Sequence, residues 1–109
     1  MIIANGTLYA SGQPAWNTEF EIEGDDIESQ TRKALENIGI LLDAIDKDYD
    51  DITKVTSYIV NPQDRLEGII TVWQEFFDAP YPCHTTIGVD QLAIDGFLIE
   101  LEIEVPVTQ

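Results

Sequence analysis

The arrangement of apolar and polar residues along the 109-residue chain predicts that strands come first and then alternate with helices. An apolar start at residues 1–4 is followed by Asn5-Gly6, the strongest short hairpin signal, and by a second apolar segment at residues 7–11. We therefore expect an opening β-hairpin that Gly12-Gln13-Pro14 closes, because proline does not serve the interior of a ladder. Partial alternation over residues 16–23 is compatible with a third short strand at a sheet edge.

Two stretches have the periodicity of amphipathic helices. The first begins at Gly24-Asp25-Asp26, where acidic residues suit a helix N-terminus, and its apolar residues recur at three- and four-residue steps over residues 27–45. Gly39 weakens the middle of this helix by roughly 1 kcal/mol relative to alanine, which indicates close packing against a neighbour. A second apolar stripe covers residues 66–77.

Three further segments have the composition of strands. Residues 52–60 are rich in β-branched residues and tyrosine, residues 85–89 follow a proline-rich break, and residues 97–105 alternate before Pro106. The order β-β-(β)-α-β-α-β-β predicts an α/β (α+β) fold, with a single-layer mixed sheet and both helices on one face. The length fits a single domain that covers residues 1–109.

The last of these strands has two chemically different faces. One face is apolar and should meet the helices: Phe97, Ile99, Leu101, Ile103 and Val105. The other face carries Leu98 and then Glu100, Glu102 and Glu104, a row typical of a solvated sheet surface. Alternatively, so short a chain could cover this face by oligomerising. Enclosure would raise the pKa of one glutamate and make that side chain a candidate acid or base.

The charge balance excludes several classes of partner. Twenty-one acidic residues against five basic ones give a net charge of −16. Nucleic-acid binding draws its affinity from Lys and Arg at phosphates, and binding to anionic membranes needs the same residues, so neither is expected. The favoured interpretation of the negative charge is a solubilising surface, and the alternative is a surface that recognises a cationic partner. Without a signal peptide, a membrane-length apolar run or a second cysteine, the expected location is the cytoplasm.

The segment Pro80–Val89 contains the chain's only histidine and its only cysteine. Adjacent residues of a strand point to opposite faces, so Cys83 and His84 are not expected to form a thiol–imidazole pair. Two ligands are also too few for a metal site without recruited carboxylates. For His84 we consider a cleft-lining or ligand-contacting role, a structural hydrogen-bonding role and, third, metal binding. Cys83 is expected to be a buried small hydrophobe.

Seven segments form a pattern over nearly the whole chain: Ser11-Gly12-Gln13, Gln30-Thr31, Ala34–Ile38, Val55–Val60, Trp73–Phe77, Pro82–Val89 and Leu98–Glu102. Together they resemble the Rid family (YjgF/YER057c, once called L-PSP endoribonucleases). The resemblance implies a chorismate-mutase-like fold and a homotrimer with a central β-barrel and clefts between subunits. It also implies hydrolysis of reactive enamines or imines to keto acids and ammonia, with no metal and no organic cofactor.

Site residues are carried over from the same resemblance. Glu100 would position the hydrolytic water, and the arginine that clamps a substrate carboxylate in the family falls on His84. Histidine offers a shorter donor edge than arginine and has a pKa near 6.5, so its grip on an anion would be weaker and pH-dependent. The remaining residues expected to contact a small-molecule ligand are Ser11, Gly12, Cys83 and Thr86.

The resemblance therefore implies imine or enamine hydrolysis, in which Glu100 would activate water and His84 would act as an acid or a weaker anion anchor. The alternative is a catalytically silent trimer that binds a small metabolite or regulates. Endoribonuclease activity is not expected, because three chains of −16 each give −48 and repel RNA. The sequence departs from the family pattern at two further places that concern the catalytic residues. Ile70 replaces an asparagine that is frequent in the family, and the given sequence lacks the glycine-proline-tyrosine segment expected upstream of the first strand.

Overall fold

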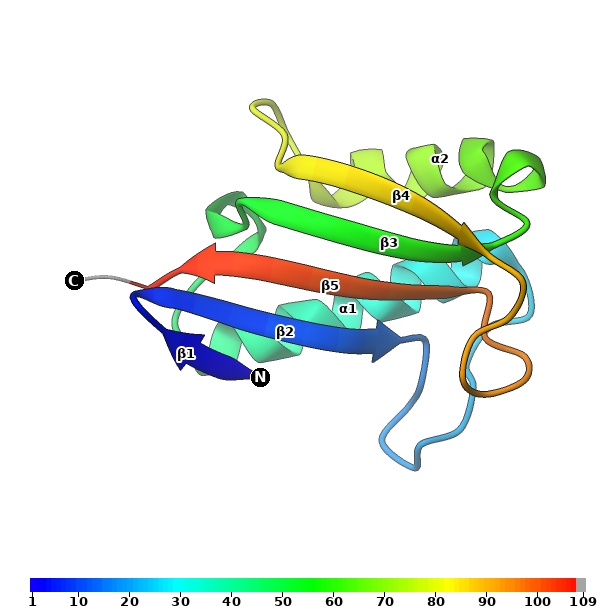
Figure 1. The fold of residues 1–109 in the computed structure, drawn as a ribbon, viewed down its shortest axis with the longest axis horizontal. Helices are drawn as coiled ribbons and strands as arrows, with labels where there is room; N and C mark the ends of the chain where they lie inside the picture. The colour runs from blue at the N-terminus through cyan, green and yellow to red at the C-terminus, as the bar shows by residue number, and fades with distance from the viewer. Residues whose placement is uncertain (108–109) are drawn as a thin grey trace.

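The computed structural model describes residues 1–107, which form a five-stranded sheet with two α-helices on one side (Figure 1). In chain order the elements are β1 (Ile2–Ala4), β2 (Thr7–Pro14), α1 (Ile27–Ala44), the 3-10 helix η1 (Tyr49–Asp51), β3 (Lys54–Val60), the 3-10 helix η2 (Pro62–Asp64), α2 (Leu66–Phe76), β4 (Cys83–Val89) and β5 (Ile99–Pro106). The strand order is β1-β2-β5-β3-β4. Strands β3 and β4 run parallel, and the other neighbouring pairs are antiparallel.

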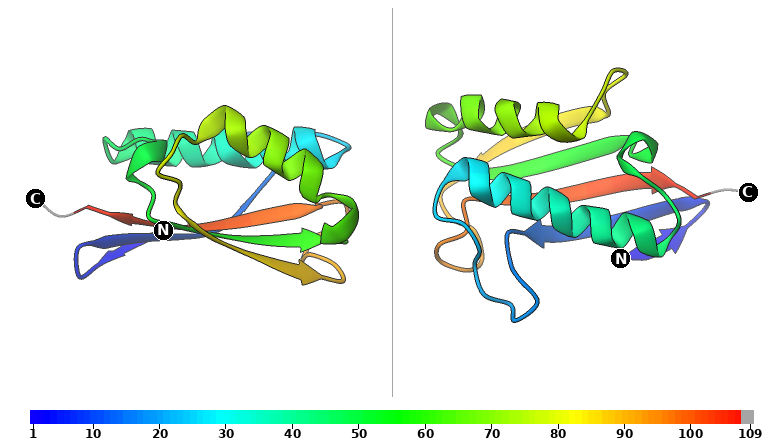
Figure 2. Two further views of the ribbon diagram at one scale, coloured as in Figure 1. Left: turned by 90° about the horizontal axis from the view of Figure 1, so that it is seen from above. Right: turned by 180° about the vertical axis from the view of Figure 1, so that it is seen from behind.

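Both helices cover the same face of the sheet, as the view from above shows (Figure 2). The core lies between the two layers, where Leu35 and Ile38 of α1 and Val72 of α2 are buried against the sheet. The opposite sheet face, which we call the open face, has no covering layer in residues 1–107. The predicted fold class is therefore confirmed. Over the same residues, no helix combines the length and apolar character that a membrane crossing requires.

The hairpin at the start of the chain has the geometry that its sequence predicts. Asn5 and Gly6 have φ values of 52° and 77°. A two-residue turn whose twist matches its flanking strands needs positive φ at both positions, and Asn-Gly tolerates this better than other pairs. The turn pairs Ala4 with Thr7 and fixes the register between β1 and β2.

Strand β2 is longer than the apolar segment of residues 7–11 that predicts it, because it continues through Gly12 and Gln13 as far as Pro14. Ala10 is opposite Ile103 and Gln13 is opposite Leu101, so β2 carries one extra residue here and forms a β-bulge. Gly12 takes a φ of 63° within the bulge. Pro14 ends the strand, as expected of a residue that cannot serve the interior of a ladder, but Gly12 and Gln13 belong to the strand and do not form a closing turn.

Residues 16–23 form a loop and not the short edge strand that their alternation suggested. One isolated bridge joins Trp16 to Ile22, and the Trp16 ring packs edge-on against Phe97 and Phe20. The alternation thus reflects a loop that folds back on itself and places an aromatic side chain over the start of β5.

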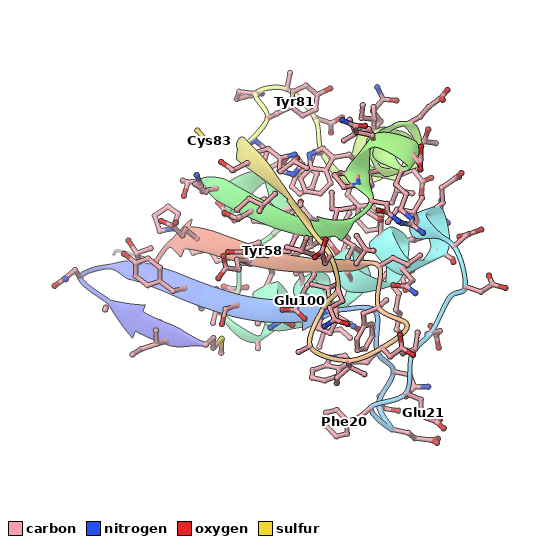
Figure 3. The ribbon with its side chains drawn as sticks, turned by 45° about the vertical axis from the view of Figure 1, so that its right-hand side comes forward. Phe20, Glu21, Tyr58, Tyr81, Cys83 and Glu100 are labelled. Carbon is pink, nitrogen blue, oxygen red and sulfur yellow. The ribbon has the colours of Figure 1, made fainter. Side chains whose placement is uncertain are left out.

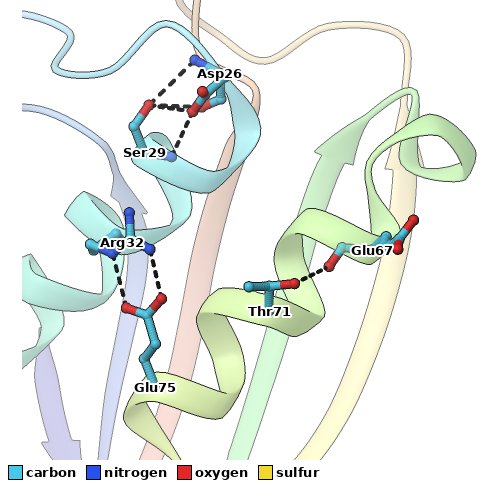
Figure 4. A network of polar contacts seen from close by, with 6 residues as sticks. All are labelled: Asp26, Ser29, Arg32, Glu67, Thr71 and Glu75. Carbon is cyan, nitrogen blue, oxygen red and sulfur yellow. Dashed lines mark hydrogen bonds and ion pairs between the residues drawn. The ribbon is translucent and has the colours of Figure 1, made fainter.

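Polar contacts fix the start of α1 and join it to α2 (Figure 4). The backbone N–H of Ser29 donates to Asp26 Oδ1 (2.8 Å), and the backbone N–H of Asp26 donates to Ser29 Oγ (3.3 Å), which completes a capping box. The Ser29 hydroxyl also donates to Asp26 Oδ1 (2.6 Å), and this bond, together with the one from the Ser29 backbone N–H, lowers the pKa of Asp26. Arg32 of α1 donates through both Nε and Nη2 to the carboxylate of Glu75 on α2, at 3.0 and 2.7 Å. This exposed pair orients the helices and adds little stability by itself.

Gln30 links three backbone groups of two loops from inside the protein, where it is 1% exposed. Its Nε2 donates to the carbonyl oxygens of Gly24 (3.2 Å) and Gly96 (2.9 Å), and its Oε1 accepts from the N–H of Leu98 (2.8 Å). A buried amide with all three contacts satisfied specifies one arrangement of the loops before α1 and before β5. It thereby sets the position at which β5 begins.

Gly39 packs against Tyr49, as the sequence indicated. A Cβ at this position would collide with the Tyr49 hydroxyl, which donates to the carbonyl oxygen of Leu35 (2.6 Å). We expect Gly39→Ala to lower the free energy of unfolding by about 1 kcal/mol, although alanine favours a helix by a similar amount, because the hydrogen bond must break. Urea denaturation should show a smaller loss for Gly39→Ala in a Tyr49→Phe background. An equal loss in both backgrounds would show that the hydroxyl is not the cause.

Candidate functional site

The carboxylate of Glu100 lies on the open face of β5, beside the bulge of β2 (Figure 3). A Cβ at Gly12 would lie 3.8 Å from Glu100 Oε2, an ordinary contact distance, so Gly12 and this carboxylate are neighbours, and the positive φ of 63° is what favours glycine here. Partial burial raises the pKa of Glu100, and the neighbouring charge of Glu102 raises it further. Glu100 is thus a carboxylate that holds a proton more readily than an exposed glutamate does.

A shallow hollow of about 350 Å³ lies farther along β5 on the open face, where Glu102 and Glu104 line it and Glu100 does not. Ser11 contributes to its wall, as do Lys54 and Thr56 of β3 and Glu102 of β5. The Tyr58 hydroxyl donates to Glu102 Oε1 (2.6 Å), which raises the pKa of Tyr58 and occupies one oxygen of that carboxylate. Glu100 has no such partner among residues 1–107, so its oxygens are free to contact a ligand.

His84 lies on the other side of the sheet, under α2. Its ring stacks on Trp73 with the centroids 4.3 Å apart and the planes 7° from parallel. Its Nε2 is 2.7 Å from the hydroxyl oxygen of Ser57, a buried residue of β3. Burial under the indole lowers the pKa of His84, so the ring is neutral at pH 7. Of the roles considered for this histidine, the structural hydrogen bond is present.

A groove of about 320 Å³ opens beside His84, between α2 and the start of β4. Its walls are mostly apolar and aromatic: Ile69, Ile70, Trp73 and Gln74 from α2, and Tyr81, Pro82 and His84 from the segment that leads into β4. The imidazole is therefore both held by the core and available at the edge of this groove.

The two other residues expected at the site lie on opposite faces of β4. Thr86 shares the helix-covered face with His84 and is paired with Ser57. Cys83 begins the strand opposite Lys54, on the open face, and is exposed (Figure 3). The expectation of a buried cysteine was wrong, because β4 is the edge strand and its first residue has no covering layer. In residues 1–107 no group of three or more His, Cys, Asp and Glu side chains is placed to hold a metal ion.

The structure thus divides the expected site residues into two groups. Ser11, Gly12 and Glu100 lie together on the open face, whereas His84 and Thr86 lie on the helix-covered face. His84 is opposite Val55 on β3 and Glu100 is opposite Tyr58, which places their Cα atoms roughly 14 Å apart for ordinary strand spacings. One chain does not bring the glutamate and the histidine to one substrate.

Two residues that the sequence did not single out define the surroundings of His84. Ser57 occupies a core-facing position between Val55 and Ile59, where a lone hydroxyl among β-branched residues indicates a buried polar partner. In the sequence Trp73 belongs to the apolar stripe of residues 66–77 and to the Trp73–Phe77 segment of the family pattern, and neither assigns it a role at the site. Its contact with His84 depends on the packing of α2 over β4, which the sequence pattern does not specify.

Comparison with known proteins assigns the chain to a family. The family described as "Endoribonuclease L-PSP" matches residues 1–107. A protein of Lactococcus lactis subsp. lactis (strain IL1403), named as a candidate regulator, AldR, is 37% identical over 102 residues, or 93% of this chain and 79% of that protein. A Dermatophagoides farinae protein named "2-iminobutanoate/2-iminopropanoate deaminase" is 32% identical over 87 residues, or 79% and 67%.

A solved structure supports the same assignment. YyfA of Yersinia pestis, described as a protein of unknown function of the conserved Rid protein family, superposes with a TM-score of 0.88 at 33% identity. The superposition covers 96% of this chain and 83% of YyfA. Sequence and fold therefore agree that the chain belongs to the Rid (YjgF) family.

Proposed function

We propose that the protein hydrolyses a reactive enamine or imine metabolite to a keto compound and ammonia, at a site built around Glu100. The observation that carries this proposal is the partly buried, unpaired carboxylate of Glu100 beside the Gly12 backbone, with its raised pKa. The Dermatophagoides farinae relative, whose name describes an imine deaminase, supports the reaction class.

The chemistry needs one group that takes a proton and later returns it. Hydrolysis of a C=N bond adds water to the carbon and then releases the nitrogen as ammonia, which requires a proton on the leaving nitrogen. A glutamate whose pKa is raised toward neutrality serves both steps, since it removes a proton from water and donates it to nitrogen. Glu104 is opposite Tyr9 and lies on the other side of the bulge from Glu100, which is opposite Pro14.

A homotrimer would complete the site. The open face exposes the apolar side chains of Ile2, Tyr9 and Ile87, and such a surface is commonly covered by association. Within one chain Glu100 and His84 lie on opposite faces of the sheet, so a cleft between subunits is the simplest way to unite a glutamate with a histidine. Light scattering tests the assembly. A monomer at micromolar concentration would remove the intersubunit cleft from the proposal.

The second candidate is a trimer that binds a metabolite without turnover. The ring of His84 is neutral and its Nε2 is engaged by Ser57, so it lacks the permanent charge expected of a carboxylate clamp. The candidate regulator AldR among the relatives is consistent with a binding role. We do not propose ribonuclease activity, because a net charge of −16 opposes contact with phosphates.

Release of ammonia from freshly generated imines separates the two candidates. Glu100→Gln is expected to reduce the rate by about 100-fold, the usual contribution of a positioned acid or base. The rate of the wild type should rise with pH through the pKa of Glu100, which lies above its ordinary value, because the base must be ionised. Glu104→Gln, on the same face of the same strand, is the control and should keep its rate.

Two outcomes would contradict hydrolysis at Glu100. Equal rates in Glu100→Gln and the wild type would reject the role of this carboxylate. A wild type that releases no ammonia above the uncatalysed background, across a panel that contains both carboxylate-bearing and uncharged imines, would favour the binding trimer.

A further inference from the structure

The groove between α2 and β4 has walls that carry no formal charge. Its seven lining residues include two isoleucines, a proline, an indole and a phenol, but no Lys, Arg, Asp or Glu. The side chain of Ile70 is 53% exposed there and that of Tyr81 57%, so apolar surface is open to a ligand. A volume of about 320 Å³ is at the small end of ordinary ligand pockets.

The hydrogen bond between Ser57 and His84 determines which ring nitrogen carries the proton. Ser57 is fully buried, and His84 Nε2 is the hydrogen-bond partner of its hydroxyl among residues 1–107. If Nε2 carried the proton, the buried hydroxyl would have nowhere to donate, which costs about 1–3 kcal/mol. The Ser57 hydroxyl therefore donates to Nε2, and the neutral ring carries its proton on Nδ1.

The stacked indole holds this ring in a fixed plane. Trp73 is 8% exposed and packs on Phe77 as well as on His84, so it belongs to the core and moves little. A donor fixed by a core side chain on one face and by a buried hydroxyl at its edge is preorganised, which reduces the entropy lost when a ligand binds.

We propose that this groove binds a neutral, planar molecule with a carbonyl or imine acceptor, held by apolar contacts and by one hydrogen bond from His84 Nδ1–H. An anion is disfavoured because the walls hold no cation and the whole chain carries −16. A cation is disfavoured because the walls hold no carboxylate and His84 presents a donor. The chemical class that remains is an uncharged, unsaturated compound.

This inference rests on the proposed function for its link to catalysis, because it specifies the substrate: an imine or enamine with uncharged substituents, and not one derived from a free amino acid. Binding of a ligand in the groove can be tested separately from hydrolysis at Glu100. The groove is built by α2 and β4, whereas Glu100 lies on β5, so each can be tested while the other is intact.

Three probes of one shape and different charge test the groove: benzamide, benzoate and benzamidinium. Binding is followed by fluorescence in a Trp16→Phe background, where Trp73 is the remaining tryptophan, and by NMR of the His84 ring. We expect saturable binding of benzamide at a concentration at least tenfold lower than either charged probe. In His84→Arg the order of benzamide and benzoate should reverse, because a guanidinium forms a bidentate pair with a carboxylate.

Two variants of exposed isoleucines on the helices show where the probe binds. Ile70→Glu should abolish benzamide binding, whereas Ile40→Glu on α1, whose native side chain is 68% exposed, should leave it unchanged. Because neither residue belongs to the core, these variants keep the test decisive if His84→Arg does not fold. Equal binding of all three probes, a preference for benzoate or benzamidinium in the wild type, or no saturable binding of benzamide would each overturn the inference.

The outcomes also separate this inference from the proposed function. Binding of benzamide together with no release of ammonia from any imine would reject hydrolysis and leave the groove as described. Ammonia release that is lost in Glu100→Gln, with no benzamide binding and unchanged turnover in Ile70→Glu, would reject the groove alone.

Discussion

Gln30→Leu is expected to lower the free energy of unfolding by about 3 kcal/mol, a large fraction of the stability of a chain this size. Leucine is close in volume to glutamine and suits a helix, so neither packing nor helix propensity accounts for the loss of stability. The loss comes from the backbone groups that Gln30 no longer satisfies. The carbonyl oxygens of Gly24 and Gly96 and the N–H of Leu98 lose their partner together, and each buried unsatisfied group costs about 1–3 kcal/mol.

Urea denaturation followed by circular dichroism measures this loss. Gln74→Leu is the matched control, since it places the same substitution on a solvent-exposed helix position and should change stability by less than about 0.5 kcal/mol. A loss below 1 kcal/mol in Gln30→Leu would show that the two loops do not depend on the buried amide.

Trp73→Ala is expected to destabilise the protein by about 3–5 kcal/mol, because truncation of a buried aromatic residue removes its contacts and leaves a cavity. The same change should raise the pKa of His84 toward 6.5, since burial is the cause of the lowered value. Trp73→Phe keeps an aromatic ring at the site and should show a smaller change in both quantities.

The two effects have separate measurements. A titration of the His84 ring by NMR reports the pKa, and thermal or urea denaturation at several pH values reports stability. Because the pKa is lowered in the folded state, the unfolded chain binds more protons below pH 6.5, so His84 costs the wild type stability as pH falls through that range. This part of the pH dependence should shrink in Trp73→Ala. An unchanged pKa would show that the indole does not shield the ring.

Local signals in the sequence were sufficient for most of the fold. Asn5-Gly6 predicts its turn because few other pairs accept positive φ at both positions. The apolar residues of α1 recur with the 3.6-residue period of a helix, and those of β5 with the two-residue period of a strand. Each pattern therefore predicts both the type of element and its buried face. The charge row on β5 likewise predicted the open face that carries Glu100.

The arrangement of the candidate site depends on contacts between segments far apart in the chain. Side chains alternate along β4, so the sequence predicts that Cys83 and His84 lie on opposite faces of the sheet. It does not predict which of the two faces the helices. That depends on the parallel register that places His84 opposite Val55. The contact of His84 with Ser57 and Trp73 joins β4, β3 and α2, and no short motif encodes three elements at once. The prediction of a strand at residues 16–23 failed for a local reason. These residues form a loop that packs on itself, and its side chains alternate in the sequence as those of a strand do.

The bulge in β2 limits how this chain can change in length during evolution. Between Ala10 and Gln13 the strand contains one residue more than β5 opposite it, and deletion of that residue would move every later position of β2 to the other face of the sheet. The carbonyl of Pro14, which accepts from the Asn37 side chain, would then point to the opposite edge of β2 and lose this partner. We expect relatives to differ in length within residues 17–23, and to keep the same number of residues from Ala10 to Pro14.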